Sequence, residues 1–146
     1  MIGKDRGSGG KEILGESASG RKISVLVVDD EYAHRHLMCQ LLRSVGFDVV
    51  AEADNGQEGL VQYNLHKPQF IVLDMNMPKM SGLDMLIEVR KADPSALVIM
   101  CTSMDDKETV TSLAKAGAAD YIVKPIDRPL VIAKLSAFVS RFELRR

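Results

Sequence analysis

Acidic, hydroxyl and amino side chains follow directly after several short apolar runs of this sequence. Asp29 and Asp30 come after the first run, and Asp74 comes after a later one. Thr102 and Lys124 occupy the equivalent position after two further runs. Carboxylates that cluster repel one another, so one of them is driven to take up a proton unless a cation neutralises the charge. If the fold gathers these five side chains, they form a site for a cation and an anionic group.

Magnesium suits such a set of oxygen ligands, because Mg²⁺ keeps several waters and commonly binds one or two carboxylates together with phosphate oxygens. An aspartate carboxylate is also able to act as a nucleophile and become an aspartyl phosphate. Phosphoryl transfer needs positive charge around the phosphoryl oxygens, which Mg²⁺ and Lys124 would supply while the Thr102 hydroxyl donates a hydrogen bond. Asp74 is the best-placed nucleophile, because it leaves a middle strand and begins a loop able to rearrange.

Strands and helices must alternate along the chain to bring these residues together. Continuous or alternating apolar runs predict strands at residues 23–28, 47–53, 70–73, 96–101 and 121–123. After each run, apolar residues recur at helical spacing. This order predicts a single-domain α/β fold, a doubly wound five-stranded parallel sheet with helices on both faces. Ligands of such sheets bind at the carboxyl ends of the strands, where the five polar residues stand.

The helical patterns also indicate which apolar residues outline each helix. They include Leu37 and Leu41 in the first helix, Leu60, Val61 and Leu65 in the second, Leu86 and Ile87 in the third, Val110 and Leu113 in the fourth, and Val131, Leu135, Phe138 and Phe142 in the last. Residues 1–22 show no such pattern and hold six of the eleven glycines, so we expect a flexible Gly/Ser-rich tail or linker before a domain at 23–146.

Composition excludes several classes of protein. The chain of 146 residues is 46% hydrophobic and 27% charged, as in folded soluble domains, and its formal charge is −1. A near-neutral chain argues against direct nucleic-acid binding by this segment. The apolar runs are too short for a membrane span, and no secretory signal is evident. Cys39 and Cys101 lie in apolar segments and are expected to be reduced and buried in a cytoplasmic protein.

Four segments of the chain resemble the receiver domain of two-component response regulators, in particular the chemotaxis regulators. They are residues 25–31 (VLVVDDE), 74–82 (DMNMPKMSG), 102–103 (TS) and 121–125 (YIVKP). The resemblance extends over about residues 22–143. It implies the flavodoxin-like (βα)5 fold with strand order 2-1-3-4-5.

The resemblance also implies a role for each matching residue at the acidic site. Asp74 corresponds to the phosphoacceptor, Asp30 to a direct Mg²⁺ ligand and Asp29 to its water-mediated neighbour. Asn76 would bind the metal through its backbone carbonyl. Lys124 corresponds to the cation that contacts the phosphoryl group, and the bond from Lys124 to Pro125 to a cis peptide.

Two further residues correspond to the parts of the family that respond to phosphorylation. Thr102 resembles the switch hydroxyl that closes onto the phosphoryl group, and Tyr121 the aromatic switch that turns inward. Ser103 is small, as the pattern requires. Met104 departs from it, because many members carry a polar residue there, and this bears on the lifetime of the phosphorylated form.

The function implied is that of a phosphorylation-activated signalling domain rather than an enzyme with turnover, its only reactions being self-phosphorylation and autodephosphorylation. The expected donor is a sensor histidine kinase or a phosphotransfer protein. The fourth helix, fifth strand and fifth helix would then change affinity for a downstream protein target or for an effector domain of the same protein. We expect a monomer or a phosphorylation-dependent homodimer, and no membrane partner.

Other interpretations compete with this one. A flavin-binding electron carrier would require a phosphate-binding loop where Asp29 and Asp30 stand, and an aspartyl phosphatase would require a second acidic side chain where Asn76 stands. A receiver-like protein that only binds partners would not require the acidic set. For single residues, an aspartate after a strand often caps a helix, and Tyr121 is equally consistent with simple packing. The histidines His34 and His36 point to different sides of a helix and are not expected to share a metal ion.

Overall fold

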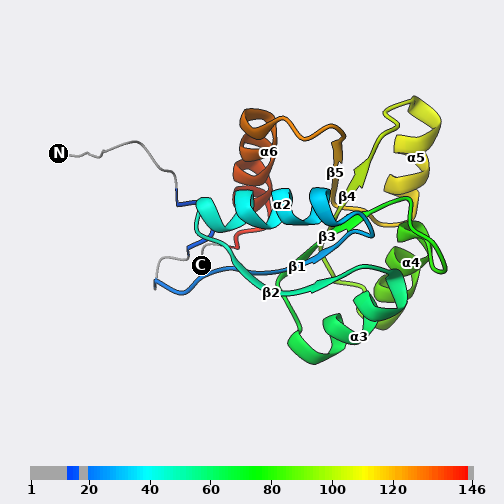
Figure 1. Ribbon diagram of the computed structural model, residues 1–146, viewed down its shortest axis with the longest axis horizontal. Coiled ribbons are helices and arrows are strands. Elements are labelled where there is room, and N and C mark those ends of the chain that lie inside the picture. The colour runs from blue at the N-terminus through cyan, green and yellow to red at the C-terminus, as the bar shows by residue number, and fades with distance from the viewer. Residues whose placement is uncertain (1–12, 17–19, 145–146) are drawn as a thin grey trace.

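The structure is a computed structural model, and it describes residues 13–16 and 20–144. Strands and helices alternate through this part of the chain (Figure 1). In order they are β1 (Ser24–Val28), α2 (Tyr32–Ser44), β2 (Asp48–Ala53), α3 (Gly56–His66), β3 (Phe70–Asp74), α4 (Gly82–Ala92), β4 (Val98–Thr102), α5 (Lys107–Lys115), β5 (Asp120–Val123) and α6 (Arg128–Arg141).

The described strands form one five-stranded sheet in the order β2-β1-β3-β4-β5. Each neighbouring pair of strands is parallel. The strand β2 lies on one side of β1, and the later strands β3, β4 and β5 are added in order on the other side. The doubly wound α/β fold and the strand order predicted above are therefore confirmed. Since all strands run the same way, the residues that follow β1, β3, β4 and β5 meet at one edge of the sheet.

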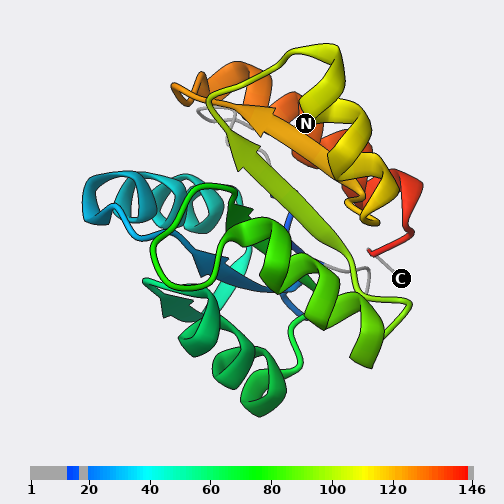
Figure 2. The same ribbon diagram turned by 90° about the vertical axis from the view of Figure 1, so that its right-hand side faces the viewer.

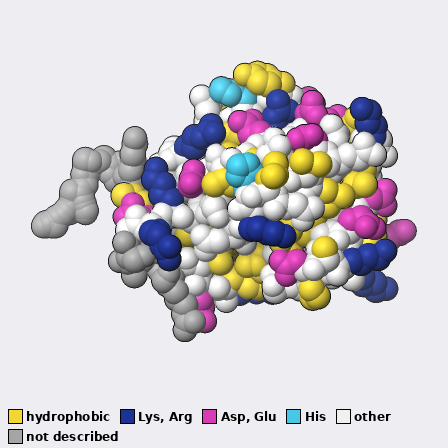
Figure 3. Space-filling model, turned by 90° about the horizontal axis from the view of Figure 1, so that it is seen from below, with side chains coloured by type: hydrophobic (Ala, Val, Ile, Leu, Met, Phe, Trp, Pro, Cys, Tyr) yellow, Lys and Arg dark blue, Asp and Glu magenta, His cyan; other side chains and the backbone are white. Residues whose placement is uncertain are grey.

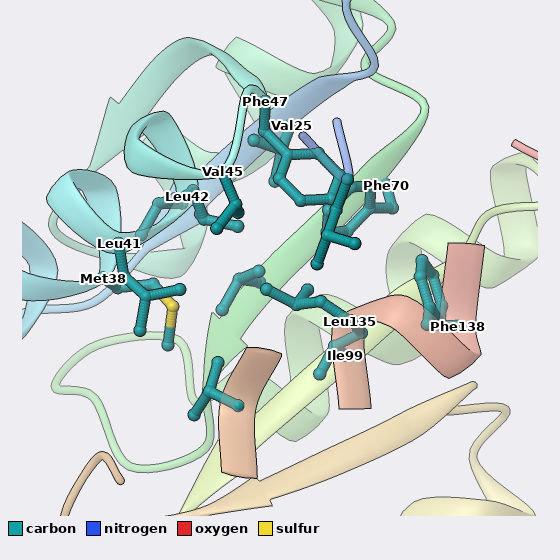
Figure 4. Packing of buried hydrophobic residues seen from close by; sticks show 14 of the residues in the cluster. Val25, Met38, Leu41, Leu42, Val45, Phe47, Phe70, Ile99, Leu135 and Phe138 are labelled. Atoms are coloured by element: carbon teal, nitrogen blue, oxygen red, sulfur yellow. The ribbon is translucent and has the colours of Figure 1, made fainter. Parts of the chain in front are cut away.

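Helices α2 and α6 cover one face of the sheet (Figures 1 and 2). We call this the aromatic face, because Phe47, Phe70 and Phe138 are buried there, with Phe70 in contact with each of the other two rings. The ring centroids of Phe47 and Phe70 lie 5.5 Å apart, and those of Phe70 and Phe138 lie 5.1 Å apart. Figure 4 shows these rings among aliphatic side chains from β1, α2 and α6.

Helices α3, α4 and α5 cover the opposite face, which we call the methionine face. Met85 and Met100 are fully buried there, and three further methionines of the loop after β3 pack against them: Met75, Met77 and Met80. Flexible thioether side chains fill irregular gaps between neighbouring side chains. We therefore expect the methionine face to adjust to changes in packing more easily than the rigid rings of the aromatic face.

In two helices, apolar residues that the spacing places on the inner side are exposed to solvent. Leu37 of α2 is 47% exposed, and Val61 and Leu65 of α3 are 50% and 69% exposed. The inward side of α3 is formed by Gly56, Gly59 and Tyr63. A side chain at Gly59 would come within 2.7 Å of Met85, so the helix rests on its neighbours through a glycine surface, which apolar periodicity does not reveal.

Residues 13–16 of the predicted tail lie against the domain. Leu14 is 3% exposed within the aromatic core, and the Gly15 N–H donates to the carbonyl of Val45. The Gly15 carbonyl accepts in turn from the Ile23 N–H at 2.6 Å. This stretch therefore packs as part of the domain, because Leu14 completes the core at the amino-terminal edge of the sheet. Residues 1–12 and 17–19 lie outside the described residues.

Cys39 and Cys101 are free and buried, as their apolar surroundings predict. Burial raises the pKa of both thiols to about 12. Across the described residues, none of the helices has the length and apolar character needed to cross a membrane.

Candidate metal and phosphoryl-transfer site

The polar residues at the strand ends meet at the carboxyl edge of the sheet. Asp29 and Asp30 follow β1, Asp74 is the last residue of β3, and Lys124 follows β5. The Lys124 ammonium lies 3.0 Å from Asp74 Oδ1 and 3.6 Å from Asp29 Oδ2. One carboxylate oxygen from each of the three aspartates lies within 4.8 Å of the others. The structure thus brings together four residues, of which the first, Asp29, and the last, Lys124, are 95 positions apart in the sequence.

The three carboxylates fit a single magnesium ion. Oxygen ligands on opposite sides of a Mg²⁺ ion lie about 4.2 Å apart, so the observed spacing requires only small side-chain movements or one ligand acting through water. Asp30 is exposed, whereas Asp29 and Asp74 are buried, so the cluster opens to solvent on one side. A pocket of about 560 Å³ lies over it, and Asn76, Ser103 and Glu31 complete its lining.

The Asp74 carboxyl is held in an environment that disfavours its charge. Only 3% of the residue is exposed, and this burial, together with the negative charge of Asp29, outweighs the hydrogen bond from Lys124 and raises the pKa of Asp74 to about 6. Burial alone would lower the pKa of Lys124, but its hydrogen bond to Asp74 and the charge of Asp29 dominate and raise it. The site therefore holds more negative charge than its one ammonium compensates, which favours binding of a cation.

The position of Asp29 is fixed from several sides. Its carboxylate accepts a hydrogen bond from the Glu31 N–H at 2.9 Å, and its backbone carbonyl accepts one from the Arg35 guanidinium at 2.8 Å. Arg35 is itself paired with Glu52 of β2 at 3.2 Å. His34 Nδ1 lies 3.9 Å from Asp29 Oδ2, beside the acidic cluster, whereas His36 stacks on Tyr32.

The loop after Asp74 is anchored at both ends. The Met75 N–H donates to the carbonyl of Cys101, and the Gly82 N–H donates to the carbonyl of Met75. An added Cβ at Gly82 would come to 2.0 Å from the Asp74 carbonyl oxygen, so only glycine lets α4 begin this close to the site. Asn76 is thereby kept at the pocket rim, next to the acidic cluster.

Thr102 and Tyr121 lie apart from the pocket lining. The Thr102 hydroxyl is fully buried, accepts from the Met104 N–H at 3.0 Å and donates to the Met104 carbonyl at 3.3 Å. Tyr121 is partly buried beside α5, and the Lys134 ammonium sits 4.4 Å from the centre of its ring. The peptide bond between Lys124 and Pro125 is cis, as the resemblance implies.

A sequence model of the response regulator receiver domain family matches residues 25–136. The chain belongs to this family. The receiver is similar to the chemotaxis protein CheY of Listeria monocytogenes, with 40% identity over 113 residues that cover 77% of this chain and 95% of that protein. It is 38% identical to CheY of Thermotoga maritima over 112 residues, covering 77% and 93% of the two chains.

A solved structure agrees with this assignment. The crystal structure of a CheX–CheY complex with BeF3 and Mg²⁺ from Borrelia burgdorferi contains a chain that matches 90% of this receiver, with 98% of that chain covered. The TM-score is 0.83 and the sequence identity is 30%. The chain is thus a phosphorylation-activated signalling domain of the two-component type, and its acidic cluster corresponds in kind to the magnesium site of such domains.

Sequence reasoning missed the residues that support the receiver site. Arg35, Glu52 and Lys134 act on Asp29 or Tyr121 from other elements. Nothing in the local pattern marks them, because a charged residue on a helix or at a sheet edge is ordinarily solvated. Gly82 carried a signal, since a glycine that opens a helix directly after a polar loop is compatible with close backbone approach.

Proposed function

We propose that Asp74 is the phosphoacceptor of this receiver and that Asp29, Asp30 and Asp74, with the backbone carbonyl of Asn76, bind the Mg²⁺ ion. The observation that carries the proposal is the buried Asp74 carboxylate, which lies 3.0 Å from the Lys124 ammonium and beside two further carboxylates in an open pocket. Bound Mg²⁺ supplies positive charge to the phosphoryl oxygens and neutralises the aspartates.

In this reaction a carboxylate oxygen of Asp74 forms a bond to phosphorus. The bond between phosphorus and the donor nitrogen of a phosphohistidine breaks, and its electron pair remains on that nitrogen. Lys124 stays in contact with the transferred group through its ammonium, which already touches the nucleophile. The raised pKa of Asp74 keeps the free carboxylate basic, and therefore more nucleophilic than an ordinary surface aspartate once it is ionised.

The switch residues have room and partners for two arrangements. Thr102 must give up its hydrogen bonds to the Met104 backbone to reach a phosphoryl group on Asp74. Tyr121 borders a hollow of about 190 Å³ between α5 and β5, together with Val110 and Leu113. If the Thr102 hydroxyl moves toward Asp74, it leaves a space into which the Tyr121 ring is able to turn. The surface formed by α5, β5 and α6 would then change its affinity for a partner.

The proposed partners are a sensor histidine kinase or a phosphotransfer protein on the donor side, and a protein target or a linked effector domain on the output side. The protein would act in the cytoplasm, where free thiols such as Cys39 and Cys101 stay reduced. It would carry out self-phosphorylation and autodephosphorylation without further turnover.

Phosphorylation by a small-molecule acyl phosphate tests the assignment of Asp74. The protein incubated with this donor and Mg²⁺ should gain the mass of one phosphoryl group, and hydroxylamine should remove it. Asp74→Asn should abolish the gain. Asp54→Asn is the matched control, because Asp54 follows the neighbouring strand β2 but lies outside the acidic cluster. Labelling that persists in Asp74→Asn would refute the proposal.

Thermal unfolding with Mg²⁺ and beryllofluoride tests the metal ligands. A ligand that binds only the native state raises the unfolding midpoint, so the parent protein should be stabilised by the two together. Asp30→Ala should reduce this rise strongly, while its unfolding without Mg²⁺ should remain cooperative. No rise in the parent protein would contradict a phosphoryl site in this pocket.

A further inference from the structure

A groove of about 690 Å³ runs between α4 and α5, on the methionine face and away from the acidic pocket. In Figure 2, the yellow-green strand β4 is visible between the green helix α4 and the yellow helix α5. The apolar part of the groove is formed by Leu83, Ile87 and Pro94. Its charged part is entirely basic, from Arg90, Lys91 and Lys115.

The apolar floor is exposed because α5 covers little of it. Thr109 and Leu113 are the residues of α5 that are buried. Ile87, which points from α4 into the groove, remains 39% exposed. Figure 3 shows that hydrophobic side chains reach the surface among charged ones on the side of the molecule seen from below. A partly covered apolar floor of this kind gains stability when another chain removes it from water.

The basic side chains of the groove lack acidic partners inside it. Within the part of the chain that the structure describes, neither Arg90 nor Lys115 forms an ion pair with a carboxylate. Lys91 pairs only with Glu88 of its own helix, at 3.6 Å and largely in solvent. No acidic residue lines the groove. Positive charge therefore stands on both walls, over an apolar floor.

The Arg90 guanidinium is held in place before any partner arrives. It donates a hydrogen bond to the carbonyl of Ala96 at 3.0 Å, and it lies against Gly117, where a Cβ would come to 2.6 Å from its Nε. A guanidinium fixed in this way loses little freedom when it binds a carboxylate. Its remaining N–H groups are able to bind an anion without any rearrangement of the helix.

We propose that this groove binds an acidic segment of a partner protein that also carries apolar side chains. The apolar residues of the segment would cover Leu83, Ile87 and Pro94, and its carboxylates would pair with Arg90 and Lys115 on the two walls. A nucleic acid suits the groove less well, because no aromatic ring lines it for base stacking. The groove shares no lining residue with the acidic pocket, so the inference does not depend on phosphorylation of Asp74.

The binding of a synthetic peptide tests the proposal. The probe is a fluorescent amphipathic peptide with leucines on one side and glutamates on the other, and its matched partner carries glutamine at each glutamate. Anisotropy should show saturable binding of the acidic peptide to the full chain, with much weaker binding of the glutamine peptide. Backbone NMR shifts should be concentrated on α4, α5 and the loops after them.

Charge reversals on one helix provide the decisive comparison. Lys115→Glu, in the groove, should weaken binding of the acidic peptide about tenfold, since repulsion between like charges replaces an attractive pair. Lys107→Glu makes the same change at the other end of α5, outside the groove, and should leave the affinity within about twofold. Ile87→Asn should also weaken binding, whereas Leu130→Asn, which changes an exposed leucine of α6, should not.

Three results would overturn the proposal. The first is the absence of saturable binding, and the second is equal binding by the Lys115→Glu and Lys107→Glu proteins. The third is displacement of the peptide by a single-stranded oligonucleotide that binds the same residues more tightly, which would make the partner a nucleic acid. Thermal unfolding of each variant shows whether its fold is retained, so that a loss of binding is assigned to the groove.

Discussion

The two faces of the sheet are packed by different means. On the aromatic face, α6 buries Val131, Leu135, Phe138 and Val139. The ring of Phe138 contacts those of Phe70 and Phe142. On the methionine face, α5 is anchored by Leu113 as its one large buried side chain. Both hollows next to α5 open on this second face. Helix α5 is thus held by fewer buried apolar side chains than α6, and this gives α5 more freedom to move.

The weak packing of α5 bears on how the protein could respond to a change at the acidic site. Thr102 is the last residue of β4, and Tyr121 of β5 borders the hollow beside the loosely held α5. An element with few buried apolar contacts opens at a lower free-energy cost than one in the core. We therefore expect a change at the acidic site to move α5 more readily than α6.

The largest expected effect is the loss of an aromatic ring. Phe138→Ala should lower the free energy of unfolding by about 4 kcal/mol, because it leaves a cavity among rings that have no freedom to refill it. Leu113→Ala, on the methionine face, should cost about 2 kcal/mol, since α5 is able to shift inward. Urea unfolding measures both changes. Equal losses would show that the two faces are packed with the same rigidity.

A pair of glycine substitutions tests the softness of the methionine face. Gly82→Ala should cost about 3 kcal/mol, because the new methyl group meets the backbone of Asp74, which has no room to move. Gly59→Ala should cost less than about 1 kcal/mol, because its neighbour is the flexible end of Met85 and alanine favours the helix. Chemical denaturation of the two variants side by side decides the matter. A larger loss for Gly59→Ala would contradict the adaptable packing described here.

The acidic site lies at the edge where the two faces meet, and its charge opposes folding. The pKa of Asp74 is about 6 in the native state, against about 3.9 for an unfolded chain. The native state therefore binds the proton more tightly, so this group destabilises the protein above pH 6, and the penalty disappears as the pH falls below about 4. Asp74→Asn should raise the free energy of unfolding by about 2 kcal/mol at pH 7.5 without Mg²⁺.

The pH dependence distinguishes this effect from a simple improvement in packing. The gain from Asp74→Asn, measured by thermal or urea unfolding, should shrink as the pH is lowered from 7.5 towards 5. Asp105→Asn, an exposed aspartate outside the cluster, should change little at either pH. A gain that stays constant with pH would mean that charge is not its cause.

The smallest expected effect concerns the clamp on Tyr121. Lys134 contacts the tyrosine ring and pairs with Asp120 at 3.3 Å. Lys134→Met should cost about 0.5–1 kcal/mol of stability and broaden or shift the NMR signals of the Tyr121 ring. Lys91→Met removes an ion pair that is largely in solvent, and it should leave stability almost unchanged. Unaltered Tyr121 signals in Lys134→Met would exclude the clamp.

The sequence predicted the fold well because its strong signals are local. Each buried strand is a β-branched run that stops at a polar residue, and the carboxyl edge then follows from parallel pairing. It also predicted that Asp29, Asp30, Asp74 and Lys124 would meet. It did not predict which side of α3 faces inward, because Gly59 and Tyr63 replace the expected aliphatic stripe.

Non-local contacts explain the remaining failures. Leu14 lies in a glycine-rich stretch without helical or strand periodicity, and its place in the core depends on Val45 and Phe47, more than thirty residues away along the chain. The hydrogen bonds of Thr102 to the Met104 backbone choose one of two orientations that the residue type alone leaves open. Such choices depend on packing and hydrogen bonding that emerge only when the elements are assembled.

The contact of Leu14 with the underside of the sheet has a practical consequence for protein engineering. A shortened protein that starts at Ile23 would lack the buried side chain of Leu14 and the hydrogen bonds made by Gly15. A fluorophore or affinity handle attached ahead of Ile13 would enter at the pole opposite the acidic pocket, since Gly15 contacts the turns that precede β1 and β2. Reporters joined there leave the phosphoryl chemistry unobstructed, provided that residues 13–16 are kept.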